Sequence, residues 1–184
     1  MPGRVAWWAV VVLLAAGCSS GSRADTTAPA ASDQADVWFM QHMVPHLRQK
    51  TAIVSLTRAR IWHPRLTRLA DTMARRDQAD SDRLLGWLAQ RGLAPHGHSH
   101  QRIDNRRPTD LERLARLRGT RLDLAFLDVM LARGRAGIAI CIAEVRHGRL
   151  PDVRQLARRM LADQRREVRR LRAWRRAWST AATP

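Results

Sequence analysis

The sequence predicts an all-α protein, a four-helix bundle built from two repeated helical hairpins. Residues 36–87 align without a gap on residues 123–174, and thirteen of the 52 aligned pairs are identical. The shared positions are mainly apolar and recur at helical spacing. No segment alternates apolar and polar residues as a half-buried strand does. Two such hairpins bury their apolar stripes by packing on each other, in one domain over 36–178.

Each hairpin has the same order of elements. Asp36 and Asp123 are expected to open its first helix, where a short carboxylate side chain caps free backbone N–H groups. Pro64 and Pro151 begin its second helix, where proline costs no hydrogen bond. Arginine pairs largely avoid the apolar stripe of the last helix, which consists of Val153, Leu156, Ala157, Met160, Leu161, Val168, Leu171 and Trp174.

A polar, histidine-containing loop over 92–108 joins the repeats 36–91 and 123–178, and 179–184 form a tail. Thr109 and Glu112 match a capping box, which predicts that the third helix opens there. Gly119 is expected to bend or break that helix.

The N-terminus predicts a lipoprotein signal peptide over 1–18. Arg4 precedes a 12-residue apolar run that ends in Ala-Ala-Gly-Cys. The run is shorter than the ~20 residues that span a bilayer, but it suits a signal core. Small residues before Cys18 resemble a bacterial lipobox, so we expect export and a lipid on Cys18. Residues 19–35 would tether the domain to the extracytoplasmic face of the cell membrane. An ordinary secretory signal or an uncleaved anchor is the alternative.

The formal net charge is +17, and Lys50 is the only lysine among 33 basic residues. Such a charge ordinarily suggests nucleic acid binding, but export argues against that partner. Anionic lipid headgroups and acidic wall polymers are the polyanions that an exported protein meets. The excess of arginine fits genomic base composition as well as function.

Two further features have structural interpretations. Asp77, Asp80 and Asp82 alternate with arginines on the second helix, which predicts a solvated face of i,i+4 ion pairs. Cys141 lies in an apolar run, so we expect a buried thiol with no disulfide partner.

Short motifs across 36–178 together resemble the domain-of-unknown-function 305 family: Phe39-Met40, Met43-Val44-Pro45-His46, Leu69-Ala70, Gln78-Ala79-Asp80, Trp87-Leu88, Phe126-Leu127, Met130-Leu131 and Gln164 with Glu167. The resemblance implies a ferritin-like helical bundle of a secreted or lipid-anchored bacterial protein. Some members handle copper outside the cytoplasm, so it also implies copper as a ligand.

The chain departs from the family at the histidines. Members carry a His-His pair after the proline, whereas this chain has His46-Leu47 in the first repeat and Arg133-Gly134 in the second. Isoleucine also replaces the later methionine in both repeats, at 53 and 140. The site implied by the family is therefore largely lost, and a cation at 133 opposes a metal nearby.

Two segments are candidate metal sites. His42 and His46 lie on adjacent turns, and Met43 offers a thioether, a set that suits Cu(I). The alternative is that the methionine fills the core and the histidines lie on the helix surface.

The second candidate is the tract His96, His98 and His100, which alternates with small residues as Cu(II)-chelating segments do. Its alternative is a solvated loop. The sequence argues against a di-iron site, because only three glutamates follow the leader and Glu-x-x-His occurs once, at Glu144 and His147.

These observations predict an exported, lipid-anchored, non-catalytic protein that binds copper, as Cu(I) or Cu(II), or another transition metal. No phosphate loop, nucleophile elbow or His-Glu-x-x-His motif is present, so no enzyme is predicted. The alternative is a bundle without metal that docks its arginine-rich face on anionic lipid, wall polymer or an envelope protein. The sequence makes no prediction of oligomeric state.

Overall fold

The computed structural model describes residues 33–96 and 109–181, which are helical with no strand. The elements are α1 (Gln34–Thr57), the 3-10 turn η2 (Arg58–Arg60), α2 (Pro64–Ala89), α3 (Asp110–Arg116), α4 (Gly119–His147) and α5 (Pro151–Ala181). The prediction of an all-α domain is confirmed. The predicted leader and nearly all of the tether lie outside the described residues.

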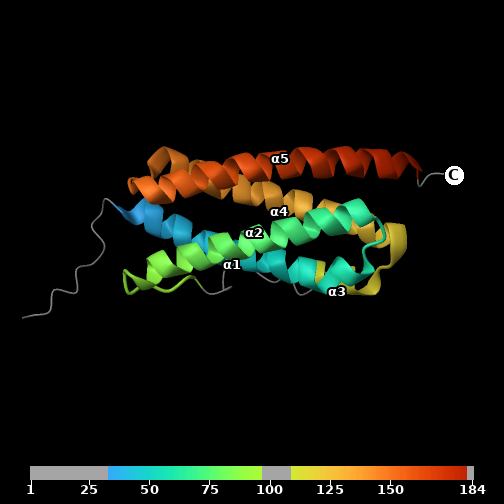
Figure 1. Ribbon diagram of the computed structural model, residues 1–184, viewed down its shortest axis with the longest axis horizontal. Helices are drawn as coiled ribbons and strands as arrows, with labels where there is room; N and C mark the ends of the chain where they lie inside the picture. Colours follow the sequence, from blue (N-terminus) through green and yellow to red (C-terminus); the bar gives the residue numbers. More distant parts are fainter. Residues whose placement is uncertain (1–32, 97–108, 182–184) are drawn as a thin grey trace, which may run out of the picture.

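The four long helices lie side by side along the long axis of the molecule (Figure 1). α1 packs on α2, α4 packs on α5, and the two hairpins meet most closely where α1 contacts α4. Along the opposite seam, α2 and α5 stay further apart and meet through long side chains, including an ion pair between Arg159 and Asp80. The bundle therefore has one tight apolar seam and one wider polar seam.

The apolar core forms two clusters, one toward each end of the bundle. One contains Phe39, Met43, Leu84 and Met160 among others. The other includes Ile53, Leu66, Phe126 and Leu171. Burial of each such side chain contributes about 1.5–3 kcal/mol, so both clusters stabilise the hairpin pairing.

Asp36 and Asp123 do not cap their own helices, so that expectation was wrong. α1 begins at Gln34 and α4 at Gly119, which places both aspartates inside helices, with 0% exposure. The carboxylate of Asp36 accepts the backbone N–H groups of Arg149 and Leu150, both at 2.9 Å. It therefore caps the start of α5, in the other hairpin.

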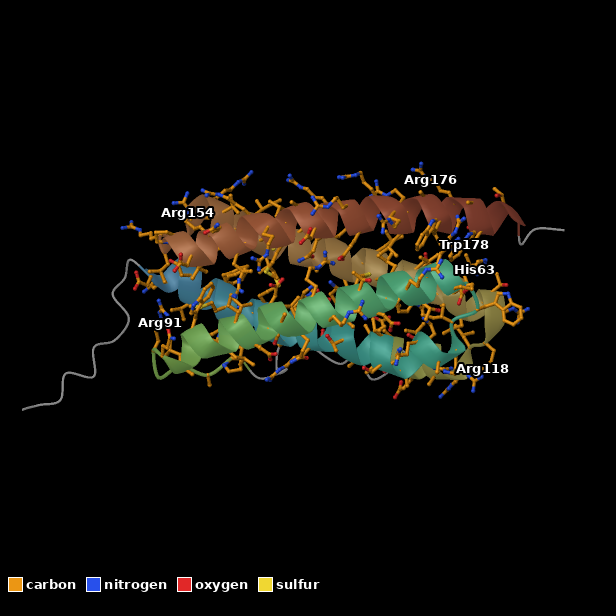
Figure 2. The ribbon with its side chains drawn as sticks, viewed as in Figure 1. His63, Arg91, Arg118, Arg154, Arg176 and Trp178 are labelled. Carbon is orange, nitrogen blue, oxygen red and sulfur yellow. The ribbon has the colours of Figure 1, made fainter. Side chains whose placement is uncertain are left out.

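Asp123 makes the matching contacts at the start of α2. It accepts the backbone N–H groups of Trp62 at 3.0 Å and His63 at 2.9 Å. Nδ1 of His63 also lies 2.6 Å from the Asp123 carboxylate, and the His63 ring stacks on Trp178 at 3.9 Å (Figure 2). The cap thereby joins the starts of α2 and α4 to the end of α5.

The connection into α4 follows the sequence prediction. Thr109 and Glu112 form the predicted capping box at the start of α3. Gly119 adopts φ +55°, a conformation that favours glycine, and the helix breaks between Arg116 and Gly119. The guanidinium of Arg60 donates to the last carbonyls of α3 and to Leu117, which closes that helix end.

Candidate metal centre

His96 lies against α1, beside His42. Its backbone N–H donates to the carbonyl of Gln41 at 3.3 Å, and the Gln41 side chain donates to the carbonyl of Ala94 at 3.0 Å. The His96 ring meets the His42 ring edge-on, with centroids 4.8 Å apart. The structure thus brings together two histidines that the sequence assigned to separate candidate sites.

The tautomer of His42 is set by its neighbour Trp38. Nδ1 of His42 lies 2.7 Å from the Trp38 carbonyl, and the two rings stack at 4.2 Å. Because a carbonyl only accepts, Nδ1 carries a proton, and in the neutral tautomer Nε2 has the free lone pair. A backbone carbonyl orients metal-binding histidines in the same way. With metal–nitrogen bonds of about 2 Å, rings up to about 6 Å apart can share an ion.

His98 and His100 lie outside the described residues. They follow His96 by two and four positions, so the predicted tract starts at the His42 side chain. Over 33–96 and 109–181, no group of three or more His, Cys, Asp or Glu side chains is placed to hold a metal ion. Any site with three or more such ligands at His42 and His96 would therefore have to include ligands from outside the described residues.

His46 and Met43 have different surroundings from His42. Met43 is fully buried in the apolar cluster, as the core-filler alternative expected. His46 is only 8% exposed and faces α4, where a Cβ on Gly137 would lie 2.8 Å from its Nε2. Among the described side chains, that nitrogen has no hydrogen-bond partner. The structure does not place Met43 and His46 beside the His42–His96 pair.

A buried polar layer separates the two apolar clusters. Its residues come from α1, α2 and α5: His46, Lys50, Asp77, Asp80, Ser81, Gln164 and Glu167. Lys50 is 1% exposed, and its Nζ lies 2.8 Å from Asp77 and 3.8 Å from Glu167. Arg76 pairs with Glu167 from the edge of the layer.

The interpretation of Asp77 and Asp80 as part of a solvated face was wrong. The two aspartates are only 5% and 6% exposed. Asp82, the third member of the pattern, is exposed and accepts a hydrogen bond from Gln78. The local alternation of charges does not distinguish a residue that faces water from one that faces a buried lysine.

The charges nearest to His46 oppose a metal cation at that side chain. Burial, with Lys50 and Arg133 nearby, lowers the pKa of His46 to about 3, so its ring is neutral. Burial raises the pKa of the Cys141 thiol to about 12, so it stays protonated. The prediction of a buried, unpaired Cys141 is confirmed. With Lys50 and Arg133 nearby, His46 is a poor ligand for copper.

Lys50 is the layer residue that the sequence could have revealed. Lys50 lies seven residues after Met43, three after Leu47 and four before Val54. This is helical spacing, so Lys50 falls on the apolar stripe of α1. In a chain whose other basic residues are all arginine, a lysine on an apolar stripe indicates a buried ion pair.

The fold places the chain among all-α proteins made of antiparallel helical hairpins. Residues 36–175 match the model of the family described as Domain of unknown function (DUF305), and the chain belongs to that family. The resemblance drawn from the motifs is therefore confirmed. No curated protein matches the chain at a significant level.

Several solved structures share the fold. A candidate secreted DUF305 protein from Streptomyces coelicolor is 23% identical, with a TM-score of 0.68 over 77% of this chain and 90% of that one. CopM in its Cu(I)-bound form is 19% identical, with a TM-score of 0.68 over 78% and 96% of the two chains. CopM in its Cu(II)-bound form is 20% identical, with a TM-score of 0.66 over 78% and 98%. Likeness at this level of identity establishes a common fold. Within the described part of the chain, no helix has the length and apolarity to cross a membrane.

Proposed function

We propose that this protein binds copper in the cell envelope without catalysing a reaction. The observation that carries the proposal is the contact between His96 and His42, whose Nε2 is free to bind a metal. The copper-bound forms of CopM, a protein of similar fold, support the choice of metal. Matching caps at Asp36 and Asp123 support a related proposal, that the bundle is a ferritin-like pair of repeated hairpins.

The copper ligands in this proposal are His42, His96 and the two histidines that follow in the tract. Imidazole suits copper in both oxidation states, and four imidazoles favour Cu(II). A tract that begins against α1 loses less conformational freedom on binding than a free loop does. His46 is left out, because Lys50 and Arg133 lie near it.

Copper titration of the full-length protein in detergent tests this site. We expect the variant His42→Ala with His96→Ala to bind Cu(II) about tenfold more weakly or worse, the loss typical when support of a metal site is removed. The variant His98→Ala with His100→Ala should lose affinity as well. His147→Ala, at the exposed end of α4, is the matched control and should bind like the wild type.

Each other outcome has a defined meaning. If only the 98/100 variant loses affinity, the tract binds alone and the role of His42 is refuted. If the wild type takes up no copper at micromolar concentration, the copper proposal fails. Circular dichroism of each variant checks that the helices are intact.

We also propose that a lipid on Cys18 holds the protein at the membrane. The alternative is that exposed arginines dock the protein on an anionic surface, and the arginines of α5 support it. Among the described residues, the exposed arginines of α5 without an ion-pair partner are Arg158, Arg165, Arg169, Arg170, Arg172 and Arg176. In Figure 2, Arg154 and Arg176 mark the two ends of this helix.

Cys18→Ser separates these two modes of attachment. With a lipid anchor, the variant should move from the membrane to the soluble fraction or fail to be processed. Arginine docking instead predicts attachment at low salt that is lost above ~0.1 M salt, because screening weakens exposed contacts. Unchanged attachment of the variant at high salt would refute both.

A further inference from the structure

Two hollows lie along the seam between α2 and α5. The first, of about 370 Å³, is called the arginine hollow and is lined by Arg65, Arg68, Leu69, Thr72, Arg170 and Trp174. The second, of about 210 Å³, is called the mixed hollow and is lined by Arg83, Trp87, Asp152, Gln155, Leu156 and Arg159. Every residue of one has its repeat counterpart, 87 positions away, in the other. The two hollows are therefore equivalent positions of the two hairpins.

Their charges differ. The mixed hollow contains the carboxylate of Asp152, and its Arg159 is paired with Asp80 at 2.8 Å. In the arginine hollow, Arg65 takes the place of that aspartate, and no acidic residue lines the hollow. Only the arginine hollow therefore lacks internal charge compensation.

Three guanidinium groups surround the arginine hollow, from two helices. Arg65 and Arg68 come from α2 and Arg170 from α5, and none has an ion-pair partner among the described residues. The nearest acid along α2, Asp71, is already paired with Arg58 at 2.9 Å. Like charges around one hollow repel each other, so an anion bound there gains from all three.

The wall of the hollow is held in place by stacking. Trp174 stacks on Trp178 at 5.6 Å, and Trp178 stacks on His63 at 3.9 Å. His63 is in turn bound to the buried Asp123. This chain of contacts fixes one side of the hollow, so the arginines alone need to be ordered when a ligand binds.

We propose that the arginine hollow binds a phosphate group. Planar guanidinium groups donate paired N–H bonds that match two oxygens of one phosphate, and several arginines around one cavity are the usual arrangement for such recognition. The volume accommodates a phosphate group with part of the molecule that bears it. Inorganic phosphate and the headgroup of an anionic phospholipid share this chemistry. This site goes beyond copper binding and docking by a whole helix face, because it is one defined cavity without a histidine ligand.

The test compares two double variants that remove the same charge. Arg68→Gln with Arg170→Gln alters the arginine hollow. The control is Arg83→Gln with Arg158→Gln. Arg83, on α2, is the repeat counterpart of Arg170, and Arg158 is an exposed arginine of α5 outside the arginine hollow. Binding of inorganic phosphate to the full-length protein in detergent is measured by calorimetry at constant ionic strength. We expect the first variant to lose about tenfold or more in affinity, since it removes two of the three guanidinium groups that donate charged hydrogen bonds to the anion. The second variant should change less than about twofold.

A vesicle arm separates the two sources of phosphate. The vesicle arm uses both double variants in a Cys18→Ser background, so that the proposed lipid on Cys18 does not insert into the vesicles. If the ligand is a lipid headgroup, binding to phosphatidylglycerol vesicles falls in the first variant, phosphatidylcholine vesicles bind neither variant, and inorganic phosphate competes. If it is free phosphate, calorimetry shows the loss while vesicle binding is the same in both variants.

Equal losses in the two double variants would show that net charge alone attracts the anion, and would overturn the proposal. Absence of binding to both probes would overturn it as well. Neither result bears on copper uptake, and replacing exposed arginines of α5 other than Arg170 should weaken vesicle docking but leave binding of inorganic phosphate intact. Circular dichroism again checks that each variant is folded.

Discussion

Replacing Lys50 by methionine is expected to lower the free energy of unfolding by about 3–5 kcal/mol at neutral pH. Methionine has nearly the shape of lysine, so the loss reports the missing charge rather than a cavity. Asp77 and Glu167, both nearly buried, would then face each other across the layer without the ammonium group that lies 2.8 Å and 3.8 Å from them. Urea unfolding followed by circular dichroism measures the change.

A surface pair provides the matched control. Arg58 and Asp71 form an ion pair with a similar distance, 2.9 Å, but the Arg58 side chain is exposed. Arg58→Met should cost less than about 1 kcal/mol. The double variant Lys50→Met with Asp77→Leu should be more stable than Lys50→Met alone, because it leaves fewer buried charges unpaired. A Lys50→Met loss no larger than that of Arg58→Met would contradict the buried pair.

Replacing Glu144 by glutamine should remove most of the loss of stability that we expect as the pH rises from about 5 to about 8. Burial, with the hydrogen-bonded Asp36 beside it, raises the pKa of Glu144 to about 8 from an ordinary 4.5, against the opposing charge of Arg154. Asp36 accepts two backbone N–H groups, and the neighbouring Glu144 holds a proton at neutral pH.

The direction of the pH dependence follows from the raised pKa of Glu144. The folded state holds a proton on Glu144 that the unfolded chain releases, so the contribution of Glu144 to stability is greatest below about pH 4.5 and falls until about pH 8. Between pH 5 and pH 8 the wild type should lose about 2–4 kcal/mol, and Glu144→Gln should lose much less. Some dependence of stability on pH should remain in Glu144→Gln, because burial also raises the pKa of Asp77.

Thermal unfolding over this pH range measures the effect. Glu112→Gln, on the exposed capping box of α3, is the control and should keep the wild-type slope. An unchanged slope in Glu144→Gln would mean that Glu144 is ionised in the folded protein.

The helices were predictable because their signals are local. The prolines at the starts of α2 and α5, the capping box at Thr109 and the break at Gly119 each depend on a few neighbouring residues. The role of Asp36 was not predictable in this way, because its partners lie 113 and 114 residues further along the chain. The repeat showed that Asp36 and Asp123 matter, and its local interpretation as a helix cap chose the wrong helix.

The sequence predicted which residues belong to the candidate site, but it did not predict how they are arranged. His42 and His96 both stand out by composition, yet their contact depends on how the end of the α2 hairpin returns to α1. The sequence analysis did not predict the buried polar layer, because helical periodicity identifies only apolar residues as buried. Lys50, Asp77 and Glu167 come from three different helices and pair only in the folded structure.

The crossed contacts of Asp36 and Asp123 also bear on how the domain holds together. Each hairpin lacks the acceptor for its own turn and receives it from its partner, so neither half is a complete structure when separate. A lone hairpin would satisfy the same groups by pairing with a second copy of itself. In this chain the two halves are covalently joined, and the result is equivalent to a homodimer with a fixed stoichiometry. In such a joined pair the two halves need not be identical, and here one hollow of the seam carries arginine where the other carries aspartate.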